Sequence, residues 1–222
     1  MSKIAVVAGA TGLVGGELVR LLLEHAGYDH VVTLGRRQTG LQHPRLTERT
    51  VLFDRLEEGT DQLLQGADVF CALGTTIRKA GSEAAFRQVD YEYPLALGRA
   101  ALRDGAARFL MVSSIGANRE SSFFYLRVKG DIEQALAELK LPELAIFRPS
   151  QLLGERKEAR PAERLAGVLV KPLGKLLIGR LAKYRAIEAR TVALAMVRAA
   201  QRGTPGVRIY ESNEIAALAA GT

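Results

Sequence analysis

The stretch VVAGATGLVGGELV, residues 6–19, decides the fold, because it joins an apolar run to a helical pattern through three spaced glycines. The apolar run starts with KIAVVAG at residues 3–9, and the helical period continues through residues 12–25. A short, continuously apolar run is typical of a strand that is buried on both faces of a sheet. The stretch therefore predicts a buried strand that leads directly into a helix.

The same alternation repeats along the chain. Short runs rich in Val, Ile, Leu and Phe alternate with longer segments of helical period. Further strands are predicted at residues 30–36, up to 50–53, 68–74, 107–114, 144–150 and 207–211, and further helices at about 82–103, 121–139, 188–202 and 213–219. Buried strands that alternate with helices predict an α/β fold with a doubly wound, mostly parallel sheet, the Rossmann fold.

The pattern loosens after Ser150. Residues 154–187 are basic, contain Pro161 and Pro172, and show helical apolar spacing without clear strands. We expect this small C-terminal helical segment to lie over the carboxyl edge of the sheet, with residues 155–187 facing a substrate or a partner. No linker or repeat divides the sequence, so residues 1–222 are predicted to form one domain.

The composition narrows the class of protein. Of the 222 residues, 48% are hydrophobic and 25% are charged, which suits a globular domain with a substantial core. No apolar run reaches the roughly 18 residues of a membrane span, and the N-terminus lacks a signal-peptide layout, so a cytoplasmic protein is expected. The single cysteine, Cys71, lies in the apolar run DVFCAL and is expected to be a packed core thiol, and the sequence offers no convincing metal cluster.

The net charge of +7 is compatible with nucleic acid, an acidic membrane surface or anionic small molecules as ligands. The sequence shows no recognised nucleic-acid module and no long Lys/Arg block. A nucleotide cofactor is therefore the less demanding explanation, and no nucleic-acid partner is expected.

The glycine loop predicts a phosphate site. Gly9 permits a tight turn, Gly12 permits close approach of the backbone to a pyrophosphate, and Gly15 permits close packing of helix on strand. The helix N-terminus adds free N–H groups and a positive dipole, and a plain tight turn is the alternative. The expected cofactor contacts here are Gly9, Thr11, Gly12, Leu13, Val14 and Gly15.

Arg36 and Arg37 follow the second predicted strand, where an NAD site normally has an acidic residue for the ribose hydroxyls. Guanidinium groups bind a 2′-phosphate well, so NADP(H) is expected over NADH, although an arginine pair on a loop is often only solvated. Asp54, after the third strand, could approach the adenine amino group or could cap a short helix at 55–58.

Further motifs follow in a fixed order: CALGTT at 71–76, VSSIGA at 112–117, Tyr125 and Lys129 four residues apart, and FRPSQLLG at 147–154. With the glycine loop and the arginine pair, these motifs resemble those of the short-chain dehydrogenase/reductase superfamily, and more narrowly its atypical branch. The resemblance spans nearly the whole chain.

The resemblance implies that Tyr125 is the general acid/base, that Lys129 supports it and binds the cofactor ribose, and that Ser114 orients the carbonyl. Residues four apart share one helix face, and an ammonium stabilises a phenolate, so the spacing agrees with these roles. Which of Ser113 and Ser114 faces the nicotinamide cannot be read from the residues, although the family pattern favours Ser114.

In addition to Tyr125 and Lys129, the resemblance implies cofactor contacts at the ends of the fourth, fifth and sixth predicted strands. These contacts are Leu73, Gly74, Thr75, Ser113, Arg148 and Pro149. The LGTT stretch departs from the Asn-Asn-Ala-Gly of more typical members, which puts a catalytic Asn relay in doubt. Arg148 could instead be an internal salt-bridge residue.

An NADP(H)-dependent oxidoreductase acting on a small carbonyl or alcohol is the expected function. One alternative is an NADP(H)-binding regulatory or interaction protein, with residues 155–187 as the partner surface. A nucleotide-sugar epimerase ranks lower, because only about 70 residues follow Ser150 to bind a sugar nucleotide. A homodimer through the helices at 82–103 and 121–139, or a monomer, is compatible with the sequence.

Overall fold

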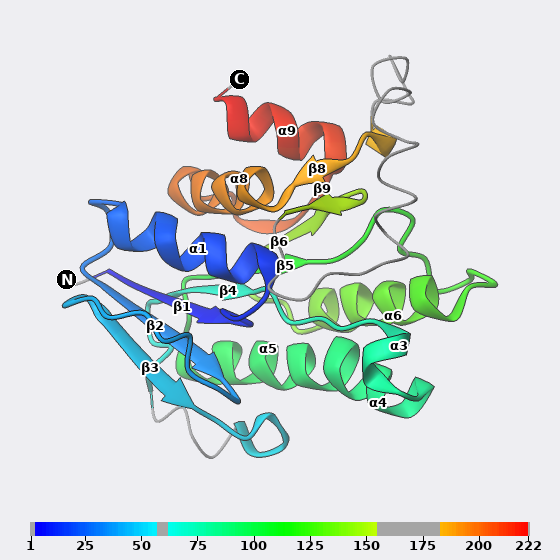
Figure 1. The fold of residues 1–222 in the computed structure, drawn as a ribbon, viewed down its shortest axis with the longest axis horizontal. Coiled ribbons are helices and arrows are strands. Elements are labelled where there is room, and N and C mark those ends of the chain that lie inside the picture. The colour runs from blue at the N-terminus through cyan, green and yellow to red at the C-terminus, as the bar shows by residue number, and fades with distance from the viewer. Residues whose placement is uncertain (1–2, 57–61, 155–182, 222) are drawn as a thin grey trace.

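A computed structural model describes residues 3–56, 62–154 and 183–221. Its centre is a seven-stranded sheet in the order β3-β2-β1-β4-β5-β6-β9, in which every neighbouring pair is parallel (Figure 1). The strands are β1 (Ile4–Ala8), β2 (His30–Gly35), β3 (Leu46–Thr50), β4 (Asp68–Cys71), β5 (Arg108–Val112), β6 (Glu143–Arg148) and β9 (Gly206–Glu211). The prediction of a doubly wound parallel sheet is confirmed.

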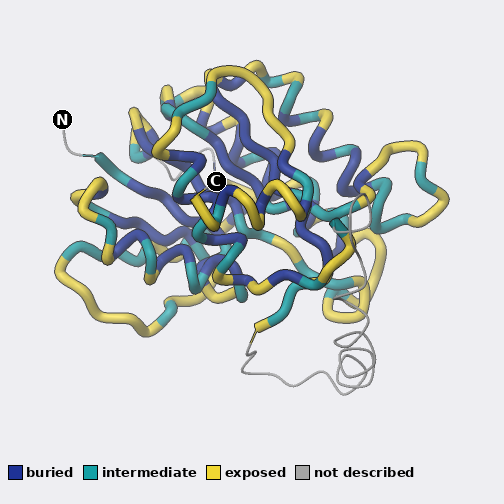
Figure 2. The backbone as a smooth tube through the Cα atoms, turned by 90° about the horizontal axis from the view of Figure 1, so that it is seen from above, coloured by how far each residue is buried: buried dark blue, intermediate teal, exposed yellow. Residues whose placement is uncertain are grey.

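Helices cover both faces of this sheet. On one face lie α1 (Leu13–Glu24), α8 (Ala189–Arg202) and α9 (Ser212–Ala220), and on the other lie α5 (Tyr93–Asp104) and α6 (Phe124–Glu138) (Figure 1). Strand β1 shows the reason for two layers, since Ala5 and Val7 pack into the first core while Val6 and Ala8 pack into the second. The central strands are accordingly buried (Figure 2).

The strand order creates a crevice at the carboxyl edge. The chain passes from β1 through β2 to β3 on one side, and then crosses to β4 on the other side of β1. Ala8, the last residue of β1, is in register with both Leu34 and Cys71, so the three neighbouring strands end together. In open parallel sheets, ligands bind at such a reversal of strand order.

The predicted helix at 82–103 is divided. It consists of α4 (Glu83–Arg87), a π-helical turn η2 (Gln88–Glu92) and α5, after the short helix α3 (Ile77–Ala80). Pro94, near the start of α5, has no N–H to donate to the carbonyl of Asp90, four residues earlier, and its ring would clash with that carbonyl in a regular helix. A wider turn at this point relieves the conflict.

Two boundaries differ from the predicted ones. The third strand ends at Thr50, and the 3-10 turn η1 (Phe53–Arg55) follows it, so Asp54 lies in a turn rather than directly after a strand. After Ser150, β7 (Leu152–Leu153) pairs in parallel with β8 (Ile187–Glu188), a pairing that the sequence did not predict. Residues 155–187 were expected to lie over the carboxyl edge and to face a substrate or a partner. Of these, residues 155–182 lie outside the described residues.

Candidate functional site

The predicted site residues gather at the carboxyl edge of the sheet. Each group follows a different strand end or lies on α6, and all parallel strands end at the same edge. The groups are the glycine loop after β1, Arg36 and Arg37 after β2, Asp54 after β3, residues 73–75 after β4, Ser113 and Ser114 after β5, Tyr125 and Lys129 on α6, and Arg148 and Pro149 at the end of β6.

The glycine loop needs its glycines for steric reasons. Gly9 has a φ of +88°, and a Cβ there would lie 2.5 Å from the carbonyl oxygen of Ala72. A Cβ on Gly15 would lie 2.1 Å from the carbonyl oxygen of Gly9. Gly12 is exposed at the start of α1, and neither a capping side chain nor an acidic residue occupies the first turn. The first N–H groups of α1 are therefore available to a phosphate, and the loop fits a dinucleotide.

Two exposed arginines follow β2, and the carboxylate of Asp54 lies on the turn after β3. Arg36 and Arg37 are both exposed after β2. Asp54 accepts hydrogen bonds from Gln88 Nε2 at 3.0 Å and from the Tyr93 hydroxyl at 3.5 Å. Burial and the Asp54 carboxylate raise the pKa of the Tyr93 hydroxyl, and the Arg36 guanidinium opposes this rise. Arg36 is therefore close enough to interact electrostatically with Tyr93.

Tyr125 and Lys129 lie on one face of α6, four residues apart. Lys129 is buried, and its Nζ forms an ion pair with Asp90 Oδ1 at 2.8 Å. Asp90 lies in the π-helical turn η2 and is 1% exposed. The ring of Tyr125 packs against Phe86 of α4 with centroids 5.6 Å apart.

The charge of Lys129 is maintained by its surroundings. Burial alone would lower the pKa of the ammonium, because a charged form loses hydration. The charge and the hydrogen bond of Asp90, together with Tyr125 and Cys71, outweigh this largest single effect, and the net pKa lies above the usual lysine value. Lys129 therefore stays a cation at neutral pH.

Asp90 is the site residue that the sequence interpretation missed. Its second oxygen, Oδ2, accepts a hydrogen bond from the backbone N–H of Thr75 at 2.8 Å. A lone acidic residue within a helical pattern looks like a solvated surface position. The available signal was Pro94, four residues later, which disturbs a regular helix at this point.

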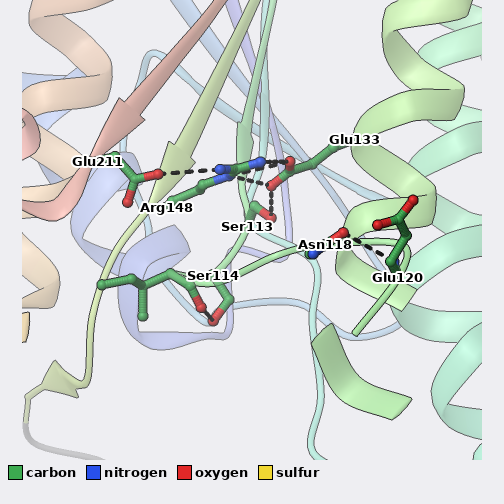
Figure 3. Close-up of polar contacts among 8 residues, drawn as sticks. Ser113, Ser114, Asn118, Glu120, Glu133, Arg148 and Glu211 are labelled. Carbon is green, nitrogen blue, oxygen red and sulfur yellow. Dashed lines mark hydrogen bonds and ion pairs between the residues drawn. The ribbon is translucent and has the colours of Figure 1, made fainter. Parts of the chain in front are cut away.

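The two serines after β5 have different partners. Ser113 is buried and donates its hydroxyl hydrogen bond to Glu133 on α6. Ser114 is partly exposed and donates only to the adjacent backbone oxygen of Ile115, at 3.3 Å. Figure 3 shows the two hydroxyls engaged with these separate partners. Of the two serines, Ser114 is the more exposed, and its hydroxyl makes the longer hydrogen bond.

Arg148 is held between two carboxylates. Its Nε donates to Glu133 Oε1 at 3.0 Å, and its Nη1 donates to Glu211 Oε1 at 3.2 Å (Figure 3). These bonds connect β6 to α6 and to β9, so Arg148 has internal salt bridges, which was one of its two expected roles. Pro149 follows it and is buried, and its carbonyl accepts a hydrogen bond from Ile115 N at 3.0 Å.

Cys71 ends β4 directly behind this region. Its side chain is fully buried, as expected of a packed core thiol, and burial raises the pKa of the thiol to about 11. In the parts of the chain that the structure describes, no group of three or more His, Cys, Asp or Glu side chains is placed to hold a metal ion. Within the same residues, no helix is both long and apolar enough to cross a membrane.

Comparisons with known proteins agree with this geometry. Residues 9–161 match the model of a family described as NAD(P)H-binding. The protein HTATIP2 of Rattus norvegicus is 39% identical over 169 residues, which cover 74% of this chain and 69% of the relative. The mitochondrial protein FMP52 of Lodderomyces elongisporus is 33% identical over 218 residues, which cover 93% of this chain and 90% of the relative.

Solved structures share the fold. The enzyme WbmH of Bordetella bronchiseptica, in complex with NAD+, superposes with a TM-score of 0.70 at 18% identity, covering 96% of this chain and 76% of the other. An identity this low shows a common Rossmann fold and nothing finer.

The prediction of a cytoplasmic protein is contradicted by the relatives. The FMP52 proteins of Lodderomyces, Scheffersomyces and Candida are named as mitochondrial proteins. Their names point to mitochondria rather than the cytoplasm. The absence of a signal-peptide layout did not indicate this, because that layout marks secretion and not other destinations.

The sequence match and the geometry of the carboxyl edge lead to the same assignment. The match includes the glycine loop and extends past Arg148 and Pro149. The chain therefore belongs to the NAD(P)H-binding family, has a Rossmann fold, and is a homologue of HTATIP2 and FMP52.

Proposed function

We propose that this protein is an NADP(H)-dependent oxidoreductase that acts on a small carbonyl or alcohol. The observation that carries the proposal is the Tyr125–Lys129 pair on one face of α6, with Lys129 kept cationic at the carboxyl edge beside residues 74–75. A protein that only bound the nucleotide would not need a phenol next to a buried ammonium.

Different residues are proposed to bind different parts of the cofactor. The glycine loop and the N-terminus of α1 hold the pyrophosphate through backbone N–H groups. Arg36 and Arg37 hold the 2′-phosphate, because no acidic residue ends β2 to accept ribose hydroxyls. The nicotinamide, when bound, supplies the hydride.

The chain's own residues then control the proton. Ser114 donates a hydrogen bond to the substrate oxygen and orients it. Tyr125 donates its phenolic proton to that oxygen as negative charge develops there, and the Lys129 cation stabilises the phenolate that remains. In the reverse direction Tyr125 accepts the proton from an alcohol.

Calorimetric titration tests the cofactor preference. Wild-type protein is expected to bind NADPH more tightly than NADH, and Arg36→Ala/Arg37→Ala should lose this preference. Arg99→Ala/Arg202→Ala removes equal charge from exposed positions on α5 and α8 and is the matched control. Equal affinity of the wild type for the two nucleotides would overturn the NADP(H) preference.

Turnover is tested with a panel of carbonyl compounds and NADPH. Tyr125→Phe is expected to lower kcat by about 10²- to 10⁴-fold while NADPH affinity stays within a few fold, because only proton transfer is removed. Tight NADPH binding by the wild type with no turnover on any compound would contradict an enzyme and favour the regulatory alternative.

A further inference from the structure

The segment formed by α4 and η2, residues 83–92, contacts both members of the Tyr125–Lys129 pair. Phe86 packs on the ring of Tyr125 at 5.6 Å, and Asp90 pairs with Lys129 at 2.8 Å. Phe86 is 0% exposed and Asp90 is 1% exposed. Phe86 and Asp90, four residues apart, thus contact Tyr125 and Lys129, which are four residues apart on α6.

Asp90 also reaches the loop after β4. Its Oδ2 accepts from Thr75 N, while its Oδ1 faces Lys129. A Cβ added to Gly74 would lie 3.4 Å from Asp90 Oδ1 and 3.9 Å from Lys129 Nζ, so the ion pair lies directly against this loop. One carboxylate therefore joins η2, the loop at Gly74 and Thr75, and α6.

The backbone around Asp90 is specialised for this arrangement. The wider π-helical turn occurs where Pro94 prevents a regular hydrogen bond to the carbonyl of Asp90. A carboxylate in such a buried position requires full compensation by a cation or by N–H donors. Asp90 has one of each, and both belong to the proposed cofactor site.

We infer that Asp90 is a positioning residue for cofactor use: it holds the Lys129 ammonium in its charged form and fixes it beside the loop at Gly74 and Thr75. This inference rests on the proposed function. Asp90 acts through Lys129 rather than by touching the reacting atoms.

The electrostatics of the pocket support this role. The groups that face Lys129 are Asp90 on η2, Tyr125 on α6 and Cys71 on β4. Among these groups, the charge of Asp90 makes the largest contribution that offsets burial. Without Asp90, burial would dominate and Lys129 would lose its proton at a lower pH.

Asp90→Asn removes the charge but keeps an oxygen that can accept from Thr75 N. The matched control is Asp131→Asn, because Asp131 on α6 pairs with Arg87 of α4 at 3.1 Å across the same interface and is 30% exposed. NADPH affinity of the apo protein is measured by calorimetry at pH 7 and pH 9, with circular dichroism to show that each variant is folded.

Asp90→Asn is expected to weaken NADPH binding about tenfold at pH 7 and further at pH 9, the size of one lost charged hydrogen bond. Wild type and Asp131→Asn should change little between the two pH values. Equal behaviour of Asp90→Asn and Asp131→Asn would overturn the role of Asp90 while leaving the proposed function intact. Failure of the wild type to bind NADPH would overturn the proposed function, and the role of Asp90 with it.

A second pair of variants separates positioning from general support of the fold. Lys129→Met and Asp90→Asn/Lys129→Met are titrated with NADPH in the same way. If Asp90 acts through Lys129, adding Asp90→Asn to Lys129→Met changes the affinity less than twofold. A further tenfold loss in the double variant would overturn the inference. This comparison does not need Asp90→Asn alone, and circular dichroism must show that both variants are folded, because Lys129→Met leaves the Asp90 carboxylate with the Thr75 N–H but without its cation.

Discussion

Each edge of the sheet buries a carboxylate that pairs with a cation, but the partners of the two carboxylates differ. At the amino edge, Asp68 is 0% exposed and is bonded to Lys3 at 3.1 Å, Arg108 at 2.8 Å and the Tyr28 hydroxyl at 2.6 Å. Arg108 also pairs with Glu143 at 3.0 Å. This amino-edge cluster, residues 3, 28, 68, 108 and 143, ties together the beginnings of β1, β4, β5 and β6.

At the carboxyl edge, the Asp90–Lys129 pair connects different kinds of elements. It connects two helical elements to a loop that the cofactor is proposed to contact, and its lysine has further N–H groups to donate. The amino-edge cluster instead joins the beginnings of strands, and its Tyr28 also bonds to Gln201 of α8. The same kind of ion pair ties strand beginnings together at one edge and, under the proposed function, holds a lysine beside the cofactor at the other.

Asp68→Asn should have the largest effect on stability. It leaves Arg108 and Lys3 with one fewer negative partner at a fully buried position, so the free energy of unfolding is expected to fall by about 3 kcal/mol. Urea denaturation measures this loss, and NADPH affinity of the folded protein should stay unchanged. The control is Asp29→Asn, because Asp29 is exposed at the same edge and accepts one bond from Lys3 N. A loss of NADPH affinity in Asp68→Asn would break the separation of the two edges.

Gly15→Ala tests the carboxyl edge itself. A Cβ at Gly15 would be 2.1 Å from the carbonyl oxygen of Gly9, so the phosphate loop must distort, and NADPH affinity is expected to fall about 100-fold, or about 2.7 kcal/mol. Gly16→Ala is the control, because its Cβ would meet Ala10 O at an ordinary 3.5 Å. Equal NADPH affinities of the two variants in calorimetry would show that the loop does not hold the cofactor.

Tyr28→Phe sharpens the comparison through its pH dependence. At pH 7 the loss of the hydrogen bond to Asp68 should cost about 1.5 kcal/mol of unfolding free energy. Burial first, and Asp68 second, raise the pKa of Tyr28 in the folded protein above its unfolded value. That stabilising contribution is complete below about pH 10 and is lost as the pH rises above it, because only the unfolded state releases the proton.

The wild type should therefore lose stability above about pH 10 more steeply than Tyr28→Phe, and the difference between them should narrow. Urea denaturation at pH 8 and pH 10.5 measures both slopes. Tyr184→Phe, at a side chain that is 52% exposed, should follow the wild type. Parallel slopes for wild type and Tyr28→Phe would contradict the role given to burial.

Arg20→Ala should have the smallest effect. Arg20 pairs with Glu17 one turn earlier on α1 at 2.6 Å, but its side chain is 60% exposed. Solvent screens such pairs, so the free energy of unfolding should change by less than about 0.5 kcal/mol. A thermal melt in low and high salt measures this, and a larger loss would mean that exposed ion pairs contribute as much as the buried ones compared above.

Much of the fold was predictable because parallel strands are buried on both faces. The run at residues 3–9 carries no polar residue on either face after Lys3, and a continuous signal of this kind locates a strand without further information. The position of the site followed from the same logic, since parallel strands place their carboxyl ends together. Gly15 could be assigned from spacing because its Cβ would meet the nearby Gly9, whereas the atom that excludes a Cβ at Gly9 belongs to Ala72, after β4.

The missed features depend on contacts between distant residues. Asp90 resembles a surface residue until the π-helical turn directs it at Lys129, 39 positions along the chain. The pairing of β7 with β8 involves two residues in each strand, too few to form a pattern. Ser113 and Ser114 are chemically identical neighbours, and only the position of Glu133 distinguishes them.

The short β7–β8 ladder joins two parts of the chain that are far apart in the sequence. It pairs Leu152 with Ile187 and Leu153 with Glu188, and Gln151 O accepts from Ile187 N at 2.9 Å, so the chain departs from and returns to one point beside the crevice. This ladder therefore couples the end of β6 to the start of α8, so a substitution at Leu152 or Ile187 affects both elements although the two positions lie far apart in the sequence.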